Sequence, residues 1–269
     1  MATLQQCASG CGLKKRIIPK FLLRGGRLFK GVRFHDNHRE AGNPVTTATV
    51  YDAYGVDEMF FLDTLAGDGV QPATIGIVER VSAAVFMPLT VGGGVRTHDD
   101  INALLRAGAD KISVNTWAVE DPSFVRSAAR TFGDQCITVS IDYREIEPGR
   151  FRVFTHGGTR PTDLDPLEWA LRMQEASCGE VVLCSIDRDG TMIGYDLDMI
   201  HRANERLTVP LIASSGAGSL QDCIDVFEAG ASAIAISTLF LFTDHSPIKV
   251  RSHLRSKGLN VRASKSSHN

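Results

Sequence analysis

Two glycine-rich segments of the chain have the composition of an anion-binding site. The segment VGGGV covers residues 91–95 and SSGAG covers residues 214–218, and each directly precedes an expected helix start, RTHDD or SLQDC. Glycine leaves backbone N–H groups unobstructed, and amides at a helix N-terminus favour negative charge. Two such segments predict a ligand with a phosphate at each end. The alternative is that these glycines only permit tight turns.

Several polar residues are expected to complete these two anion sites. Asn115-Thr116 and Ser237-Thr238 each follow the next apolar segment along the chain and supply amide or hydroxyl donors, and Asp189-Gly190 follows another apolar segment. The predicted phosphate-binding residues are Gly93, Gly94, Asn115, Thr116, Asp189, Gly190, Gly216, Ala217 and Ser237.

Asp142 and Lys30 are the predicted acid–base residues. Asp142 ends the apolar segment ITVSID, so burial is expected to raise its pKa into a range suited to proton transfer. A structural aspartate that caps the loop is the alternative. Lys30 follows a glycine-rich turn and either binds an anion, supports a base or lies solvated on the surface. Asp63 and Asp187 occupy similar strand ends without an assigned role.

An internal repeat organises these residues. LDTLAGDG at 62–69 matches LCSIDRDG at 183–190, LTVGGGV at 89–95 matches LIASSGA at 211–217, and GADKISVNT at 108–116 matches GASAIAIST at 230–238. All three pairs are separated by about 121–122 residues, which indicates two similar halves. Each half alternates short apolar segments with segments of helical period, a pattern typical of parallel strands joined by crossover helices.

The repeat predicts a single (β/α)8 barrel, an α/β fold, made of two half-barrels. The expected strands cover residues 16–23, 58–63, 88–93, 111–115, 136–142, 180–187, 210–215 and 233–239. The expected helices cover residues 44–54, 73–84, 97–107, 121–131, 165–177, 196–206, 219–229 and 246–257. In such barrels the functional groups lie at the C-terminal ends of the strands, where the residues above are placed.

Composition limits the class of protein. The formal net charge of −2 argues against a nucleic-acid-binding face, and no apolar run is long enough to span a bilayer. Cys7 and Cys11 have a loose ligand-like spacing without a second pair, so we expect reduced thiols, no metal and no cofactor. The expected organisation is a disordered arm at 1–14, the barrel at 15–262 and a flexible tail at 263–269, in a cytoplasmic protein.

The segments KRII, DEMFFLD, TVGGGV, GADKISVNT, SIDRDGT and GLNVR resemble the HisF family, the cyclase subunit of imidazole glycerol phosphate synthase, over residues 15–262. The resemblance implies the same duplicated barrel and a HisH-type glutaminase partner that sends ammonia through it. It also implies a catalytic pair of aspartates at the ends of the first and fifth strands. Asp142 matches the second of these, whereas Leu22 occupies the position of the first. Loss of one member of such a pair lowers the rate by orders of magnitude.

The resemblance further implies an ammonia gate at the N-terminal face of the barrel. The positions that match its ring of alternating charges are Arg16, Glu58, Lys111 and Glu180. Thr90 and Ser113 match small polar positions along the channel, and Asp110 matches a residue that faces the glutaminase. A solvated layer of surface charges is the alternative.

The start IIPKFLL and the loop THGGTRPTDLDP, residues 155–166, are similar to a HisF-related branch associated with acetamidino-sugar formation in surface glycans. That likeness implies a sugar amidotransferase as a further partner. Lys20 and Ser215 depart from the branch pattern. Three functions therefore stay open: an ammonia-conducting synthase subunit serving nitrogen transfer to a sugar, a cyclase of histidine biosynthesis whose missing acid is replaced by Asp63 or Asp187, and a scaffold that binds a phosphorylated ligand without turnover.

Overall fold

The structure is a computed structural model that describes residues 14–67 and 69–262. Almost all of the expected N-terminal arm, including Cys7 and Cys11, and the whole of the expected tail at 263–269 lie outside the described residues.

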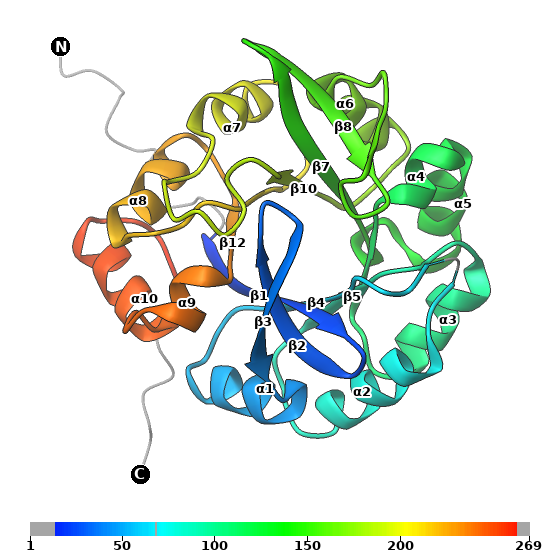
Figure 1. Ribbon diagram of the computed structural model, residues 1–269, viewed down its shortest axis with the longest axis horizontal. Coiled ribbons are helices and arrows are strands. Elements are labelled where there is room, and N and C mark those ends of the chain that lie inside the picture. The colour runs from blue at the N-terminus through cyan, green and yellow to red at the C-terminus, as the bar shows by residue number, and fades with distance from the viewer. Residues whose placement is uncertain (1–13, 68, 263–269) are drawn as a thin grey trace, which may run out of the picture.

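Eight parallel strands close into a barrel surrounded by helices (Figure 1). β10 pairs with both β7 and β11, and β12 returns to pair with β1, so the sheet has no free edge within the barrel. The strands, in the order in which they pair, are β1 (Arg16–Arg24), β4 (Met59–Asp63), β5 (Leu89–Gly92), β6 (Lys111–Val114), β7 (Ile137–Glu147), β10 (Glu180–Ser185), β11 (Leu211–Ser214) and β12 (Ala233–Ile236).

The outer layer consists of one main helix between each pair of consecutive strands and one after the last strand. These helices are α1 (Pro44–Ala53), α2 (Pro72–Ser82), α3 (His98–Arg106), α5 (Pro122–Phe132), α6 (Pro166–Glu175), α7 (Leu197–Asn204), α8 (Leu220–Glu228) and α10 (Pro247–Ser256). The predicted barrel of alternating strands and helices is therefore confirmed, with ends that differ from the expected ones by a few residues.

Additions at the ends of the strands were not predicted from the sequence. β1 continues into a hairpin of β2 (Arg27–Val32) and β3 (His35–Gly42), and β7 continues into β8 (Arg150–Thr155) and β9 (Arg160–Pro161). The remaining short elements are α4 (Thr116–Glu120), α9 (Thr238–Phe242) and the 3-10 helix η1 (Asp134–Cys136). The two β extensions begin at strands that lead the two halves, which places both over the same end of the barrel (Figure 1).

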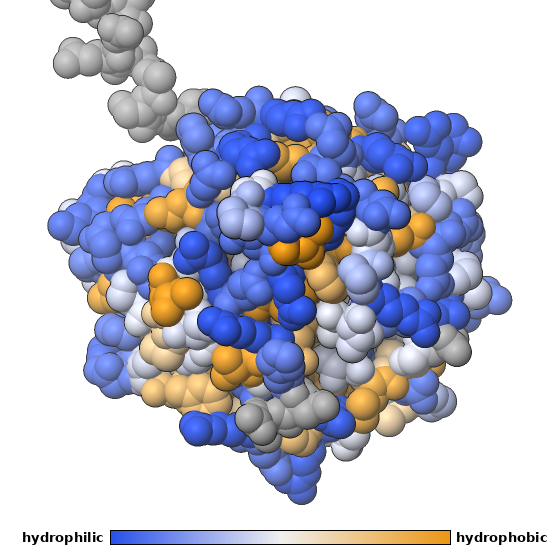
Figure 2. All heavy atoms as spheres, turned by 45° about the horizontal axis from the view of Figure 1, so that its top comes forward, coloured by the Kyte–Doolittle hydropathy of each residue, from blue (hydrophilic) through white to orange (hydrophobic). Residues whose placement is uncertain are grey.

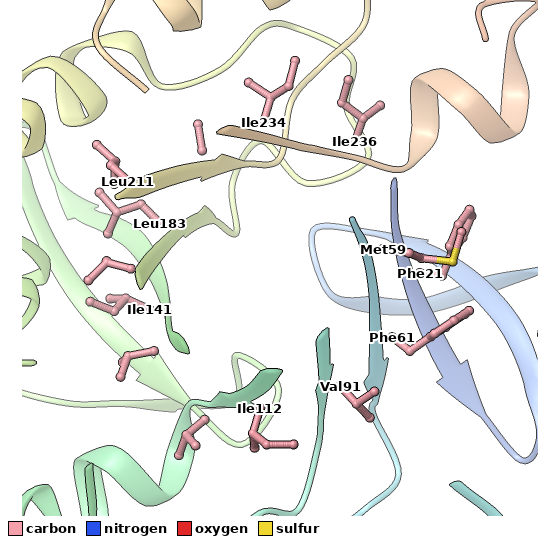
Figure 3. Close-up of a cluster of buried hydrophobic side chains, with 14 of the residues drawn as sticks. Phe21, Met59, Phe61, Val91, Ile112, Ile141, Leu183, Leu211, Ile234 and Ile236 are labelled. Atoms are coloured by element: carbon pink, nitrogen blue, oxygen red, sulfur yellow. The ribbon is translucent and has the colours of Figure 1, made fainter. Parts of the chain in front are cut away.

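Side-chain alternation along the strands separates two apolar regions. Phe21, Phe61, Ile141 and Leu183 point outward, away from the barrel axis, and pack beneath the helices (Figure 3). The inward neighbours form a small separate cluster that comprises Ile18, Phe60, Val182, Ile212, Ala233 and Ala235. Side chains alternate across a strand, so the other inward positions lie on either side of this cluster, toward the two ends of the barrel. Polar groups can occupy those positions.

The exterior is mainly polar. On the face that Figure 2 shows, apolar side chains lie in small separate groups among hydrophilic residues. Within the described residues, the helices are all too short or too polar to cross a bilayer.

Gly108 and Gly230 end α3 and α8 at equivalent places in the two halves. Both have positive φ angles, +104° and +109°, and a Cβ would overlap the side chain of Ser82 at the first position and of Asn204 at the second. These glycines therefore have both a conformational and a steric requirement, as expected of residues that terminate helices.

We expect Gly108→Ala and Gly230→Ala each to lower the free energy of unfolding by roughly 1–3 kcal/mol, because alanine is strained in this backbone conformation and crowded by its neighbour. Denaturant unfolding measures the change. The matched control is Gly76→Ala inside α2, where a Cβ meets nothing within 4 Å; helix propensity there should raise stability by about 0.5–1 kcal/mol. Equal effects at all three positions would contradict the assignment.

Candidate functional site

Four charged side chains form a closed ring at the N-terminal end of the barrel. Arg16 contacts Glu58 at 2.8 Å and Glu180 at 2.7 Å through its two terminal nitrogens. Lys111 Nζ lies 3.0 Å from the same Glu58 and 2.9 Å from the same Glu180. Each cation therefore contacts both carboxylates, and the predicted set of four charges is assembled in one place.

Burial makes this ring more than a layer of surface charges. The side chains of Glu58 and Glu180 are only 3% and 10% exposed. Desolvation acts to lower the pKa of Arg16, but the charges of Glu180 and Glu58 outweigh it and raise that pKa. Buried charges are costly unless they are paired, and Thr90, one strand along, donates its hydroxyl to Glu58. The alternative of a solvated charge layer is wrong for the two carboxylates.

Asp110 lies beside this ring at the same end of the barrel. Its carboxylate accepts a hydrogen bond of 2.8 Å from the backbone amide of Leu89, and the residue is exposed. Asp110 thus ties the start of β5 to the segment before β6 and still reaches the surface of the N-terminal face.

The opposite end of the barrel holds a cavity of about 600 Å³. Its wall contains all the predicted acid–base and phosphate-binding residues together with Leu22 and Ser113: Lys30, Gly93, Gly94, Asn115, Thr116, Asp142, Asp189, Gly190, Gly216, Ala217 and Ser237. A concave site with converging polar groups at the C-terminal face is the usual place for function in this fold.

Asp142 is buried at the floor of this cavity. Asn115 donates its side-chain amide to Asp142 at 2.7 Å. Burial raises the pKa of Asp142 to about 6, although Lys20 and the hydrogen bond from Asn115 act in the opposite direction. At neutral pH the carboxylate is therefore mainly ionised and close to its pKa, the condition that suits a general base.

Lys30 is also buried, so the alternative of a solvated surface lysine is wrong. Its Nζ lies 2.6 Å from Oδ1 of Asp189, across the gap between β2 and the loop after β10. Gly190 packs against this strand, because a Cβ there would approach the carbonyl oxygen of Gly31 and the Cα of Val32. The pairing places one cation and one anion together in the cavity wall.

The helix starts next to the glycine loops differ from the expectation in one respect. Thr97 and Ser219 begin capping boxes in which Asp100 and Asp222 accept hydrogen bonds from the amides just before α3 and α8. These carboxylates occupy the amides of Arg96, Thr97, Gly218 and Ser219 at the two helix starts, and none of these four residues is among the predicted phosphate-binding residues. The amides of the glycine loops ahead of the boxes remain as the donors that an anion in the cavity would meet.

The glycines of these loops also serve packing. Gly93 and Gly216 have φ angles of +111° and +105°, and a Cβ on either would overlap a neighbouring backbone carbonyl, of Asp63 or of Gly194. The loops are therefore held close to adjacent loops, so a turn requirement is present at these glycines, and their role in anion binding stays a prediction.

Asn115 and Ser237 provide the second signal for a ligand. They occupy equivalent positions in the two halves with nearly the same backbone angles, φ −130° and −129°. Asn115 Oδ1 and Ser237 Oγ are buried and have no hydrogen-bond partner among the described residues. Buried polar atoms without partners are uncommon in folded proteins, so a matched pair in one cavity indicates a place for a bound group. Thr116, in contrast, accepts a hydrogen bond from the backbone of His156.

Asp63 and Asp187, considered as substitutes for the acid that the resemblance places at Leu22, both have hydrogen-bond partners. Leu22 points into the cavity between Lys20 and Arg24. Asp63 accepts hydrogen bonds from the Leu65 amide and the Thr74 hydroxyl, which ties it to its own loop. Asp187 is 44% exposed and contacts Arg144 and the Glu145 amide. The two carboxylates that were open as substitutes are thus engaged in loop structure.

Lys20 is a site residue whose environment sequence reasoning did not foresee. Its Nζ is buried at the cavity floor and donates to Cys184 Sγ at 3.3 Å and Ser214 Oγ at 3.1 Å. Ser215 contacts Cys184 at 3.2 Å and Asp189 at 3.5 Å. The only available signal was the alternation of β1, which directs residues 16, 18, 20 and 22 inward.

The β2–β3 turn connects the two halves over the cavity. The backbone amide of Arg33 donates to the carbonyl of Asp189 at 2.8 Å, and its side chain donates to the carbonyl of Asp187 at 3.0 Å. Phe34 lies against Gly158 of the segment after β8, since a Cβ on Gly158 would overlap its ring. Both unpredicted extensions therefore contribute to the cavity wall.

Comparison with known proteins agrees with this arrangement. The family described as "Histidine biosynthesis protein" matches residues 16–246. The chain is also 47% identical over 250 residues to the imidazole glycerol phosphate synthase subunit HisF of Streptomyces griseus subsp. griseus, covering 93% of this chain and 99% of that protein. This chain belongs to the HisF family. The matches to the HisF family cover almost the whole of the barrel.

The buried carboxylate of this HisF-family cavity should make stability depend on pH. The pKa of Asp142 is about 6 in the folded protein, against 3.8 ordinarily, so the folded state binds its proton more tightly and loses stability as pH rises from about 4 to 6. Asp142→Asn does not titrate. We expect its stability relative to the wild type to increase by about 2 kcal/mol between pH 4.5 and 7.5 in urea unfolding.

Ser237→Ala, which changes a hydroxyl without a titrating group in the same cavity, is the control for this pH experiment. Its stability relative to the wild type should stay nearly constant over the same range. A constant difference for Asp142→Asn as well would show that the Asp142 carboxyl titrates as it does in the unfolded chain.

Proposed function

We propose that this protein is the synthase subunit of a glutamine amidotransferase, which receives ammonia from a HisH-type glutaminase at its N-terminal face and uses it in nitrogen transfer to a phosphorylated ligand. The observation that carries the proposal is the closed ring of Arg16, Glu58, Lys111 and Glu180 on the same axis as the cavity. Thr90 and Ser113 lie inward between the two ends, on β5 and β6.

The ring suits a gate because of its chemistry. Its four ion pairs close the N-terminal end of the barrel, and a change at Lys111 or at either carboxylate opens a path along the axis. Asp110, exposed beside the ring, supports docking of the glutaminase at this face. The compartment we propose for the complex is the cytoplasm.

Two features support the proposal of a phosphorylated ligand: the two glycine loops, and the buried atoms of Asn115 and Ser237 that have no partner among the described residues. A phosphate on each loop would span the cavity from one half-barrel to the other. We propose that the nitrogen acceptor is a sugar of a surface glycan, with a sugar amidotransferase as further partner. Two features support this acceptor: the loop at 155–166, part of which lines the cavity, and the loss of the strand-1 carboxylate.

The second candidate is the cyclase reaction of imidazole glycerol phosphate synthase, in histidine biosynthesis. The identity of 47% to a HisF subunit and the buried carboxylate of Asp142 favour it. The replacement of the first acid by Leu22 argues against it, because Asp63 and Asp187 are both engaged elsewhere.

A cyclase assay with free ammonia separates the two candidates. Purified protein is given the ribulosyl aminoimidazole-carboxamide substrate of the HisF family with an ammonium salt, which removes the need for a glutaminase. We expect turnover at least about 100-fold below that of Leu22→Asp, in which the second carboxylate is restored. Leu22→Asn, similar in shape but unable to ionise, is the matched control. Comparable wild-type and Leu22→Asp rates would return this chain to histidine synthesis.

The gate can be tested by measuring how tightly glutamine hydrolysis is coupled to transfer of the nitrogen to product. With a HisH-type glutaminase bound, we expect Lys111→Met to leave glutamine hydrolysis in place while reducing transfer of its nitrogen to product severalfold, because ammonia escapes from an opened floor. Rates with added ammonium salt should change little. Lys249→Met, at an exposed pair with Asp244, is the control. Unchanged coupling in Lys111→Met would contradict the gate, and absence of any complex with a glutaminase would favour a scaffold.

A further inference from the structure

His156 lies on the wall of the cavity with its imidazole between two charged groups of opposite sign. The Nε2 atom is 3.1 Å from Nη1 of Arg160 and 3.4 Å from Oε1 of Glu120. Arg160 begins β9, whereas Glu120 is the last residue of α4. The imidazole is 27% exposed, and the residue lines the cavity. One ring nitrogen therefore has both a cation and an anion within reach.

This nitrogen cannot satisfy both neighbours at the same time. A guanidinium only donates hydrogen bonds, and a carboxylate only accepts them. Without a proton, Nε2 accepts from Arg160 and has nothing to donate to Glu120. With a proton, Nε2 donates to Glu120, and the imidazolium and the guanidinium repel each other. The two contacts are therefore alternatives, and the protonation of Nε2 selects between them.

The second ring nitrogen determines the form of the neutral imidazole. Nδ1 lies 3.0 Å from Oγ1 of Thr155. The Thr155 hydroxyl donates its own hydrogen to the carbonyl of Arg160 at 3.5 Å, so its oxygen is left to accept from Nδ1. The partner of one ring nitrogen sets which nitrogen carries the proton. The neutral ring is therefore protonated on Nδ1, and Nε2 is the acceptor that Arg160 contacts.

The backbone fixes this ring against α4 in either state. His156 has a φ angle of +52°, which is uncommon for a residue other than glycine. Its amide donates to Oγ1 of Thr116, the first residue of α4, at 3.0 Å. Strained backbone persists where its surroundings hold it, and it is frequent at functional sites. The imidazole therefore stays close to Glu120 at the other end of this short helix.

Glu120 contacts His156 and a further cation with different oxygens. Its Oε2 is 4.0 Å from Nη2 of Arg96, and the Arg96 guanidinium lies over the ring of Trp117, 5.1 Å from its centroid. Among the described residues, the charged groups in contact with the imidazole are Arg160 and Glu120. A proton on His156 therefore strengthens one contact and weakens the other, and it does not require Arg96 to move.

We propose that His156 is a pH-sensitive switch in the wall of the cavity. In the neutral state it binds Arg160 within its own hairpin, and in the protonated state it releases Arg160 and forms an ion pair with Glu120. The ion pair ties the turn after β8 to α4, and both segments line the cavity. Histidine is the side chain that ordinarily changes charge near neutral pH. The switch does not depend on the proposed function, because it involves only residues of the wall.

Nitrogen-15 NMR of the histidine-labelled full chain between pH 5 and 9 tests the protonation states. The His156 signals are assigned by their absence from His156→Gln. At high pH we expect a proton on Nδ1 and none on Nε2, and at low pH a proton on both nitrogens. A neutral ring protonated on Nε2 would overturn the proposal, because such a ring donates to Glu120 at every pH.

Two variants should move the midpoint of this titration in opposite directions. Glu120→Gln should lower it by about 0.3–0.7 pH units, because the imidazolium loses its carboxylate, and Arg160→Met should raise it by a similar amount, because an opposing cation is removed. His201, which contacts Glu205 at 3.6 Å on α7, is the internal control and should titrate unchanged in both variants. Shifts in the same direction, or no shift in either variant, would contradict the switch.

Amide hydrogen exchange of peptides that cover residues 155–160 measures the tie between the turn and α4. Below the midpoint, the protection factor, which corrects for the chemical effect of pH, should rise roughly 2- to 5-fold in wild type and stay constant in Glu120→Gln. Equal protection on both sides of the midpoint in wild type would overturn the proposal. Lower protection below the midpoint would do so as well, because release of Arg160 would then open the turn.

Discussion

The pairing of two buried carboxylates with two half-buried cations at the N-terminal end of the barrel is the constraint on which the arrangement depends. Glu58 and Glu180 are desolvated by the sheet that closes around them, and each is stable there because two cations contact it. Removing one partner would leave an uncompensated charge in a region with little water, at a cost of about 3–5 kcal/mol. The sheet must therefore align the N-terminal ends of β1, β4, β6 and β10 at one level of the barrel axis. The same alignment of the strands sets the level at which every inward side chain nearer the C-terminal end lies.

This alignment of the strands arranges the inward side chains in layers along the barrel axis. Above the charges, Ile18, Phe60, Val182 and Ile212 fill the interior, and above them Lys20, Asp142 and Ser214 form the polar floor of the cavity. A polar group on an inward position is tolerated only where a partner or a cavity receives it. Leu22, two residues after Lys20 on the same face of β1, therefore places an apolar group in the wall of the cavity.

Much of this architecture could be predicted from the sequence. Three matched pairs about 121–122 residues apart, with alternating apolar and helical segments, predicted the barrel, and the duplicated glycine loops and the strand ends predicted residues around its cavity. The partners of Lys20 could not be predicted in this way, because Cys184 and Ser214 are distant in sequence and meet only through the closed sheet. The capping boxes at Asp100 and Asp222 were visible in the sequence, but their effect on anion binding depends on which amides they occupy. The two hairpins were hidden because polar turns interrupt their short strands.

The distribution of the floor charges between the two halves has a consequence for how such a barrel can be assembled from parts. The first half supplies Arg16, Glu58 and Lys111, whereas the second supplies Glu180 alone. Two copies of the first half would bring four cations to two carboxylates, and two copies of the second would bring two carboxylates with no cation. Only the union of unlike halves is electrically neutral. The charges of the ring therefore disfavour a barrel made of two copies of the same half and favour one made of the two different halves. The hydrogen bonds between the strand edges do not by themselves distinguish these combinations.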